Sequence, residues 1–188
     1  MEQIEWKLVK RIRKGDREAF AEIVELYKHK LYQLGYRMLG NPLEAEEIAQ
    51  ESFLRVYSNI GRYDQNHKFS TWIYRIATNL CIDRLRKRKI VYSLDQEVVG
   101  AEGLDMYSQL ADEKQRTPEA EVVTLEIQEQ VQKAIDQLPP QYKSIMILRY
   151  LQDLSLQEIS DIVDLPVTTI KTRVHRGREA LKKLLQHV

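Results

Sequence analysis

The sequence predicts an all-α protein made of two small helical domains joined by a flexible acidic linker. Apolar residues recur at helical spacing in both halves of the 188-residue chain, which is long enough for two small domains. The 7 glycines and 5 prolines fall mainly between these periodic segments, and the periodicity is lost near the middle. We therefore expect an N-terminal domain over residues 1–90, a linker over 91–117 and a C-terminal domain over 118–188.

Four helices are expected in the N-terminal domain. A short basic helix covers about residues 3–14, and Asp16 is the expected N-cap of a second helix that ends at Gly40. The third helix covers about residues 43–59 and the fourth about 70–89. Helical spacing assigns the core-facing residues of the second and third helices: Phe20, Ile23, Tyr27, Leu31, Leu34, Met38, Ala45, Ile48, Ala49, Ser52 and Val56.

Capping signals and prolines divide the C-terminal domain. Thr117 and Pro118 supply an N-cap and a first-turn proline. Ser155 and Glu158 can form a capping box, and a turn at residues 164–166 precedes the last helix. The first three helices expected here cover about residues 118–138, 141–152 and 155–163.

Charge is segregated along the chain, although the formal net charge is only +1. Residues 1–90 carry a net +6, residues 91–130 a net −8 and residues 131–188 a net +3. Two basic modules with an acidic connector are typical of a protein that binds a polyanion. Two ordinary solvated helical domains explain the charge alone equally well.

Several classes of protein are not expected. No apolar run reaches membrane-spanning length, and the charged N-terminus does not resemble a secretory signal. The lone Cys81 fits a reducing cytoplasm, so we expect a cytoplasmic protein. A metal is not expected, because His175 has no partner at metal-ligand spacing. No other cofactor is expected either. Paired catalytic carboxylates and a glycine-rich phosphate loop are also missing, so an enzyme is not expected.

The last two expected helices, LSLQEISDIVDLPVTTIKTRVHRGREAL, have helix-turn-helix spacing. Ile170, Val174 and Gly177 lie on one stripe of the second helix, so its opposite face can enter a DNA major groove. A solvated basic helix end is the alternative. We expect Lys171, Thr172, His175 and Arg176 to include the residues that read bases, and Thr168, Thr169, Arg173 and Arg178 to hold the phosphate backbone.

The fourth expected helix carries a second candidate nucleic-acid surface. Aromatic rings stack on unpaired bases, cations follow phosphates, and an amide can bond to a base edge. The alternative is that Trp72 anchors the core and that the basic end, RLRKRK, only aids solubility. The residues of this strip lie between two apolar stripes: Lys68, Trp72, Arg75, Asn79 and Arg86.

Together these segments resemble the extracytoplasmic-function (ECF) sigma factors, the two-domain specificity subunits of bacterial RNA polymerase. FSTWIYRIATNLCIDRLRK is similar to the family's second conserved region, and the helix-turn-helix is similar to its fourth. The linker segment GAEGLDMYSQL resembles that of the sigma-W type within the family. Two departures leave the promoter sequence open: Thr168 replaces a frequent glycine, and His175 occupies a position that varies in the family.

The resemblance implies that the chain selects promoters without catalysis of its own. The N-terminal domain is expected to melt the minus-ten element and bind its non-template strand. Residues 64–69 are expected to form a base pocket, which adds Phe69 to the strip, and Asn79 is expected to recognise a base. The C-terminal domain is expected to read the minus-thirty-five element as duplex. The acidic linker is expected to mimic nucleic acid in the polymerase channels.

Protein partners follow from the same resemblance. Core RNA polymerase is expected to bind through its clamp coiled coil and its flap, and a membrane-bound anti-sigma factor and a role in envelope stress are expected. A solvated acidic face is the alternative for the expected clamp surface. A stand-alone helix-turn-helix regulator is the alternative for the whole chain, but it leaves the strip and the acidic linker unexplained. The expected clamp-binding residues are Glu47, Gln50, Glu51 and Leu54.

Overall fold

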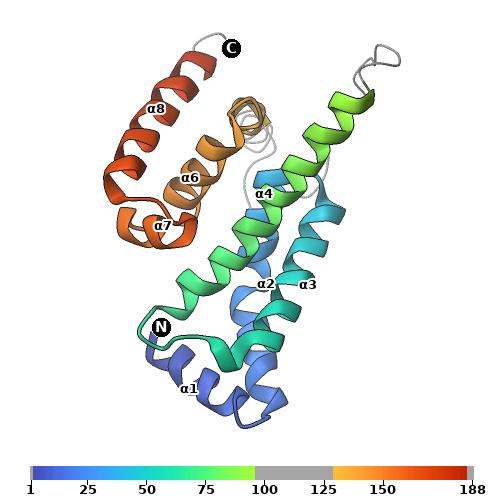
Figure 1. Cartoon of the computed structure of the whole chain (residues 1–188), viewed down its shortest axis with the longest axis vertical. Helices are drawn as coiled ribbons and strands as arrows, with labels where there is room; N and C mark the ends of the chain where they lie inside the picture. The colour runs from blue at the N-terminus through green and yellow to red at the C-terminus, as the bar shows by residue number, and fades with distance from the viewer. Residues whose placement is uncertain (1, 96–128, 186–188) are drawn as a thin grey trace, which may run out of the picture.

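A computed structural model describes residues 2–95 and 129–185 of the chain (Figure 1). The regular elements in these two ranges are all helical, which confirms the predicted fold class. Most of the expected linker, and the expected cap at Thr117 and Pro118, lie outside the described residues. The elements are α1 (Glu2–Ile12), α2 (Arg17–Leu39), α3 (Pro42–Asn59), the 3₁₀ turn η1 (Ile60–Arg62), α4 (Phe69–Asp95), a helical stretch over 129–136, α6 (Pro140–Tyr150), α7 (Leu156–Val163) and α8 (Val167–Leu185).

Capping residues set the bounds of α2 and the start of α3. Asp16 accepts a backbone hydrogen bond at 3.1 Å in the first turn of α2, which confirms its predicted N-cap role. Gly40 ends α2 in the left-handed conformation, with φ 68°. The side chain of Asn41 then accepts a hydrogen bond from Leu43 N at 2.9 Å, which caps α3. The two helices are therefore joined by a turn of two residues.

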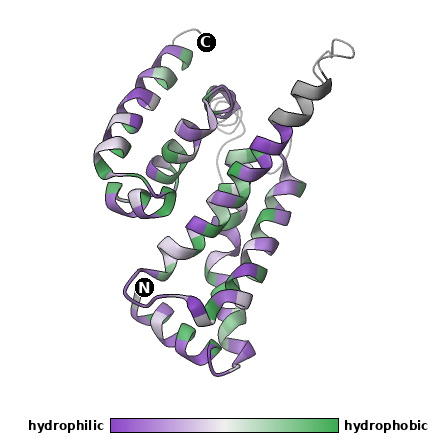
Figure 2. Cartoon of the chain, in the orientation of Figure 1, coloured by the Kyte–Doolittle hydropathy of each residue, from purple (hydrophilic) through white to green (hydrophobic). Residues whose placement is uncertain are grey.

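The core of the N-terminal domain is built around α2, which packs against α1, α3 and α4 (Figure 1). Figure 2 shows hydrophobic and hydrophilic residues interspersed along the helices, as expected where each helix buries one face. Each fully buried large apolar side chain contributes about 1.5–3 kcal/mol. Phe20 is only half-buried, but the other predicted core residues are confirmed: Ile23, Tyr27, Leu31, Leu34, Met38, Ala45, Ile48, Ala49, Ser52 and Val56.

Helix α4 is longer than the sequence analysis predicted. The predicted end near Lys89 is wrong, because the helix continues to Asp95. The prediction ended the helix where the apolar periodicity stops. However, residues 90–95 contain neither glycine nor proline, so nothing in the backbone terminates the hydrogen-bond ladder there.

The C-terminal domain packs α6, α7 and α8 around a small apolar core. Ser155 accepts a hydrogen bond from the backbone of Glu158, and the Glu158 carboxylate accepts one from the backbone of Ser155, which confirms the predicted capping box. Asp164 ends α7 in the left-handed conformation, with φ 55°. The buried residues include Ile145, Ile147, Leu148, Ile159, Ile162 and Ile170.

The two domains are in contact. Helix α4 lies against α6 and α7, and α2 also contacts α6 (Figure 1). The side chain of Arg37 donates a 2.9 Å hydrogen bond to Gln132, and the Tyr74 hydroxyl donates a 2.7 Å hydrogen bond to Gln152. The C-terminal domain therefore covers one side of α4, the helix that carries the predicted single-strand surface.

The close approach of α2 and α3 at Gly35 gives a test of this packing. A Cβ at position 35 would lie 3.0 Å from Ala45 Cα, which is too close for ordinary packing. Gly35→Ala is expected to lower the free energy of unfolding by about 1–3 kcal/mol, although alanine has the higher helix propensity. Thermal unfolding followed by circular dichroism measures the change.

Gly61→Ala is the matched control, because nothing lies within 4 Å of the Cβ position of residue 61. It is expected to leave the melting temperature unchanged or slightly higher. Equal melting temperatures for both variants and the parent chain would contradict the tight helix contact at Gly35.

Candidate nucleic-acid interface

The predicted strip on α4 reaches the surface. Trp72, Arg75 and Asn79 are spaced three and four residues apart, so they share one face of the helix. Arg75 and Asn79 are exposed, and Trp72 is half-buried. The ring of Trp72 lies 4.9 Å from that of Tyr63, which holds it in place without sealing it inside the core. Trp72 therefore packs against the core while part of its side chain stays exposed.

A surface groove adjoins this strip, with a cavity volume of about 300 Å³. Helix α4 supplies Trp72, Ile76 and Asn79, and the end of α3 and the turn η1 supply the opposite wall. We call this the strand groove. The residues of the opposite wall, which the sequence analysis missed, are Arg55, Asn59 and Arg62.

The strand groove joins the chemical groups that single-stranded nucleic acid requires. An indole can stack on a base, the amides of Asn59 and Asn79 can bond to base edges, and Arg55 and Arg62 can pair with phosphates. Arg55 already pairs with Glu51 at 2.8 Å, an exposed contact that is easily exchanged. No sequence signal marked the missed residues, because they become neighbours of α4 only when α3 and η1 fold against it.

Phe69 requires a correction. It was expected to contact DNA directly, but it is 2% exposed. Its ring makes edge contacts with Tyr27, Tyr63 and Trp72 at centroid distances of 5.7, 5.6 and 5.8 Å. Phe69 begins α4, and its ring is turned into the aromatic core. It therefore supports the loop through Tyr63 and packs against the buried side of Trp72.

Arg13, in the turn directly after α1, fastens the loop before α4. Its guanidinium donates a 3.1 Å hydrogen bond to the carbonyl of Ile60 and another hydrogen bond to the carbonyl of Tyr63. The Tyr63 hydroxyl donates to the carbonyl of His67. These contacts hold both ends of η1 and brace the ring that packs on Trp72.

A second cavity, of about 650 Å³, lies beside the same loop. One wall includes Asp64, His67 and Trp72, in the region where the base pocket was expected. The other wall comes from the C-terminal domain, from Ser160 to Pro166 around the turn between α7 and α8. Residues of both domains therefore line the cavity in this region.

The two loop-side cations of the strip pair with the C-terminal domain. Lys68 Nζ lies 3.1 Å from Glu158 Oε1, and Arg75 Nη2 lies 3.6 Å from Asp164 Oδ1. Partial burial opposes ionisation of Glu158, but hydrogen bonds from Ser155 and the contact with Lys68 outweigh it and lower the pKa of this carboxyl. At the other end of the strip, Arg86 is exposed and lies 3.2 Å from Asp83.

The outward face of α8 is open. Ile170 and Gly177 are buried on its inner stripe, and Thr172 donates a 3.1 Å hydrogen bond to the carbonyl of Thr168. Of the predicted duplex-binding residues, Thr169 and Arg173 are half-buried. The others are exposed: Thr168, Lys171, Thr172, His175, Arg176 and Arg178.

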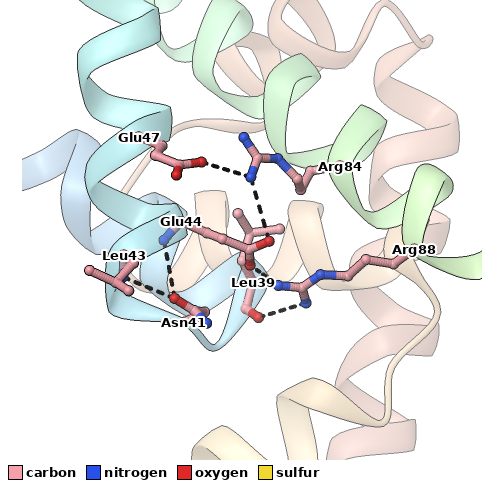
Figure 3. Close-up of polar contacts among 7 residues, drawn as sticks. All are labelled: Leu39, Asn41, Leu43, Glu44, Glu47, Arg84 and Arg88. Carbon is pink, nitrogen blue, oxygen red and sulfur yellow. Dashed lines mark hydrogen bonds and ion pairs between the residues drawn. The ribbon is translucent and has the colours of Figure 1, made fainter.

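The basic end of α4 is partly committed to internal contacts. Figure 3 shows Glu44 and Glu47 of α3 facing Arg84 and Arg88 of α4. Arg84 lies 2.8 Å from Glu47 and 3.5 Å from Glu44, and Arg88 pairs with Glu44 and donates a 3.0 Å hydrogen bond to the carbonyl of Leu39. These two arginines therefore fasten α4 to α2 and α3.

The predicted clamp-binding residues lie on the outer side of α3. Glu47 pairs with Arg84, Glu51 with Arg55, and Gln50 donates a 3.2 Å hydrogen bond to Glu46. Leu54 is 64% exposed. Leu43 and Tyr57 are also exposed large residues of this helix, so α3 carries more apolar surface than the sequence analysis assigned to it.

Within residues 2–95 and 129–185, no group of three or more His, Cys, Asp or Glu side chains is placed to hold a metal ion. Burial raises the pKa of the Cys81 thiol to about 12, so this side chain stays protonated.

A helix-turn-helix domain packed on a helical domain with a cationic, aromatic groove defines a DNA-binding transcription factor. Residues 23–90 match the family described as Sigma-70 region 2, and residues 128–181 match Sigma-70, region 4. The chain is 55% identical over 186 residues to the ECF RNA polymerase sigma factor SigW of Bacillus subtilis, covering 99% of both proteins. The chain therefore belongs to the ECF sigma factor family and is an alternative sigma factor.

A more distant relative supports the family, and two solved structures share the fold. The RNA polymerase sigma-H factor of Pseudomonas aeruginosa is 33% identical over 182 residues, covering 96% of this chain and 93% of that protein. CnrH, solved in complex with the cytosolic domain of CnrY, superposes with a TM-score of 0.72 at 17% identity, covering 98% of both chains. The sigma factor RpoE of Bartonella quintana, solved with the anti-sigma factor NepR, gives 0.68 at 19% identity, covering 89% of this chain and 96% of that chain.

Two further findings bear on the predictions. The sigma factor assignment makes the chain a transcription initiation factor, and sigma factors are not enzymes by themselves. None of the helices in the described ranges is long and apolar enough to cross a membrane.

Arg13→Gln tests whether the turn after α1 positions the strand groove. Removing two charge-assisted hydrogen bonds to the loop is expected to lower the free energy of unfolding by about 1–3 kcal/mol. It should also weaken binding of single-stranded DNA more than binding of duplex. Chemical denaturation and fluorescence anisotropy measure the two effects.

Arg11→Gln is the control, since Arg11 makes only exposed side-chain ion pairs with Asp16 and Glu22. Equal effects of the two substitutions on both measurements would contradict a positioning role for Arg13. Partial recovery by Arg13→Lys, which keeps the charge but loses the forked geometry, would support it.

Proposed function

We propose that this sigma factor holds promoter DNA with both domains at once, and that it acts without chemistry of its own. The N-terminal domain binds the melted non-template strand of the minus-ten element, and the C-terminal domain reads the minus-thirty-five element as duplex. The observation that carries the proposal is the strand groove, in which Trp72 and Asn79 face two arginines.

Strand capture follows from the groups in the groove. A base released from its pairing partner gains stacking on Trp72, which compensates for part of the lost duplex stacking. Asn79 can donate to and accept from the base edge, which supports selection among bases. Lys68, Arg75 and Arg86 attract the phosphates that flank the base.

Duplex recognition uses the exposed face of α8. The helix begins directly after Pro166, and its free backbone N–H groups favour a phosphate near Thr168 and Thr169. Lys171, Thr172, His175 and Arg176 extend toward base edges, and Arg173 and Arg178 flank the phosphate walls. The small hydroxyl groups allow the helix to approach the backbone closely.

The polymerase surface is proposed on α3. The exposed Leu54, beside Glu47, Gln50 and Glu51, would dock on the clamp coiled coil, and the C-terminal domain would contact the flap. SigW, the relative at 55% identity, is described as an RNA polymerase sigma factor.

We also propose that a membrane-bound anti-sigma factor controls this protein. The protein is proposed to act in the cytoplasm, in the response to envelope stress. CnrH was solved with the cytosolic domain of CnrY, and RpoE of Bartonella quintana was solved with the anti-sigma factor NepR.

A stand-alone helix-turn-helix regulator is the competing function, and one experiment separates the two. The sigma factor should co-purify with core RNA polymerase and direct run-off transcription from a library of promoter variants. A stand-alone regulator would purify free of polymerase and bind intact duplex as well as forked DNA.

Asn79→Ala tests the strand-binding assignment. It is expected to weaken binding of the non-template single strand by about tenfold in the polymerase complex, because a base-edge hydrogen bond contributes about 1–2 kcal/mol. Duplex minus-thirty-five binding should be unchanged. Gln141→Ala, at an exposed amide on α6, is the control. Equal losses in the single-strand and duplex assays would refute the assignment.

Arg176→Ala tests base reading by α8. If Arg176 reads a guanine with two hydrogen bonds, the substitution costs about 1–3 kcal/mol and relaxes selection at one base pair. Arg178→Ala should instead weaken binding to all sequences alike. It should also lower the slope of log affinity against log salt concentration by about one. Binding to a promoter library at two salt concentrations measures both. A sequence-independent loss for Arg176→Ala would assign this residue to phosphate.

A further inference from the structure

Helix α1 carries a basic surface to which the proposed function assigns no role. The helix precedes residues 23–90, the part of the chain that matches Sigma-70 region 2. Residues 2–17 contain six lysines and arginines and only three acidic residues, so this surface attracts anions. The exposed cations of the helix and of the turn directly after it are Lys7, Lys10, Arg11, Arg13 and Lys14.

The acidic residues nearby do not neutralise this surface. The Glu5 side chain lies on the inner side of α1, where it is 3% exposed and accepts a 2.6 Å hydrogen bond from the Tyr27 hydroxyl. Asp16 is engaged by Arg11, at 2.8 Å. The remaining lysines of the surface form no ion pair with any residue that the structure describes: Lys7, Lys10 and Lys14.

One edge of α1 shares the direction of Arg13. The backbone N–H of Arg13 donates to the carbonyl of Val9 at 3.0 Å, so Arg13 still follows the helical path. Seven residues make almost two helical turns, which places Trp6 on the same edge as Arg13, with Lys10 between them. We call Trp6, Lys10 and Arg13 the α1 edge.

The α1 edge adjoins the strand groove through the turn η1 (Figure 1). Arg13 donates hydrogen bonds to the carbonyls of Ile60 and Tyr63, which lie on either side of Arg62 in the chain. Arg62 itself lines the strand groove. A strand that leaves the groove past Arg62 is therefore led onto the α1 edge.

Trp6 has the properties of a stacking platform. It is 47% exposed, although tryptophan is usually well buried. Lys10 Nζ lies 3.3 Å from the centroid of its ring, a cation–π contact that holds the indole against the helix. Lys10 covers only one face of the ring, so exposed ring surface remains for a base, with an ammonium group beside it for a phosphate.

We propose that the α1 edge is a second binding site for the single strand, which continues the strand groove on one side of the minus-ten element. Trp6 stacks on a base outside the element, and Lys10 binds a flanking phosphate, with Lys7 and Lys14 beside it. The distance from Arg13 to Trp6 along the helix axis is about 10 Å, which spans about two to three nucleotides of a stacked strand.

The site is expected to select little among bases, because stacking and phosphate pairing do not read base edges. This inference rests on the proposed role of the strand groove. A contact with polymerase is the alternative use of the surface. The excess of unpaired cations and the continuity with the groove favour the strand.

The chain offers a matched pair of double variants. Trp6→Ala with Lys10→Gln (W6A/K10Q) removes the exposed ring and its cation without touching the buried core. Ile4→Ala with Lys182→Gln (I4A/K182Q) removes one exposed apolar side chain and one exposed cation elsewhere. Ile4 is 56% exposed and lies two residues from Trp6, on the opposite edge of α1, and Lys182 is exposed near the end of α8.

The experiment uses the full chain in complex with core polymerase and three fluorescein-labelled single strands. The short strand carries only the minus-ten sequence selected in the promoter library, and the other two extend it by about five nucleotides on the 5′ or the 3′ side. W6A/K10Q is expected to bind one of the two extended strands about three- to tenfold less tightly than the parent chain, because it loses a stacking partner and a phosphate contact.

The short strand and the other extended strand should bind W6A/K10Q and the parent chain equally. I4A/K182Q should match the parent chain for all three strands. Trp6→Phe should also stay close to the parent chain, because phenylalanine keeps an aromatic face for stacking.

Photochemical cross-linking locates the strand directly. 5-Iodouracil is placed at each extension position, and irradiation breaks its carbon–iodine bond. The uracil carbon then bonds to an aromatic ring in contact with it, with release of hydrogen iodide. Mass spectrometry of the parent complex should find Trp6 joined to a position of the extension that W6A/K10Q binds less tightly.

The outcomes separate this inference from the proposed function. If Asn79→Ala weakens strand binding but W6A/K10Q binds all three strands like the parent chain, the second site is overturned and the strand groove stands. The second site is also overturned if W6A/K10Q weakens all three strands alike, or if it lowers only the amount of polymerase complex that forms. If Asn79→Ala has no effect on any strand, the groove fails and its continuation onto α1 fails with it.

Discussion

The packing of α4 against α2 is the interaction on which both functional surfaces of the N-terminal domain depend. Ile73, Ala77 and Cys81 are buried on the inner face of α4. Because the helix turns once every 3.6 residues, burial of this face fixes the direction of the residues between its turns. Trp72, Arg75 and Asn79 thus point away from α2. The aromatic contacts of Tyr27 with Phe69 and Tyr74 hold the start of α4 at this rotation.

Arginine side chains have two separate tasks in this protein. Arg13, Arg84 and Arg88 reach backbone carbonyls or half-buried carboxylates, where a forked, permanently charged donor joins elements distant in sequence. Arg62 and Arg176 lie at open surfaces, where exchange with a phosphate costs little. A protein that must hold its fold while binding a polyanion needs both kinds, since only the exposed cations can change partners freely.

The two proposed DNA surfaces differ in shape for a physical reason. A base pair in a duplex can be read by one rigid convex helix, and α8 supplies it with a buried stripe that sets its orientation. A base outside the duplex must be received in a concavity with a stacking partner. Such a concavity needs walls from several elements, which α3, η1 and α4 form together.

The sequence by itself determined the helical fold, the caps at Asp16 and Ser155, and the faces of α4 and α8, because periodicity and capping are local. It missed the extension of α4 to Asp95, where no local signal marks the end. Only the tertiary structure placed Arg55, Asn59 and Arg62 beside Trp72, turned Phe69 into the core and brought Glu158 to Lys68. These relations join residues far apart in the chain, and they exist only once the helices have packed.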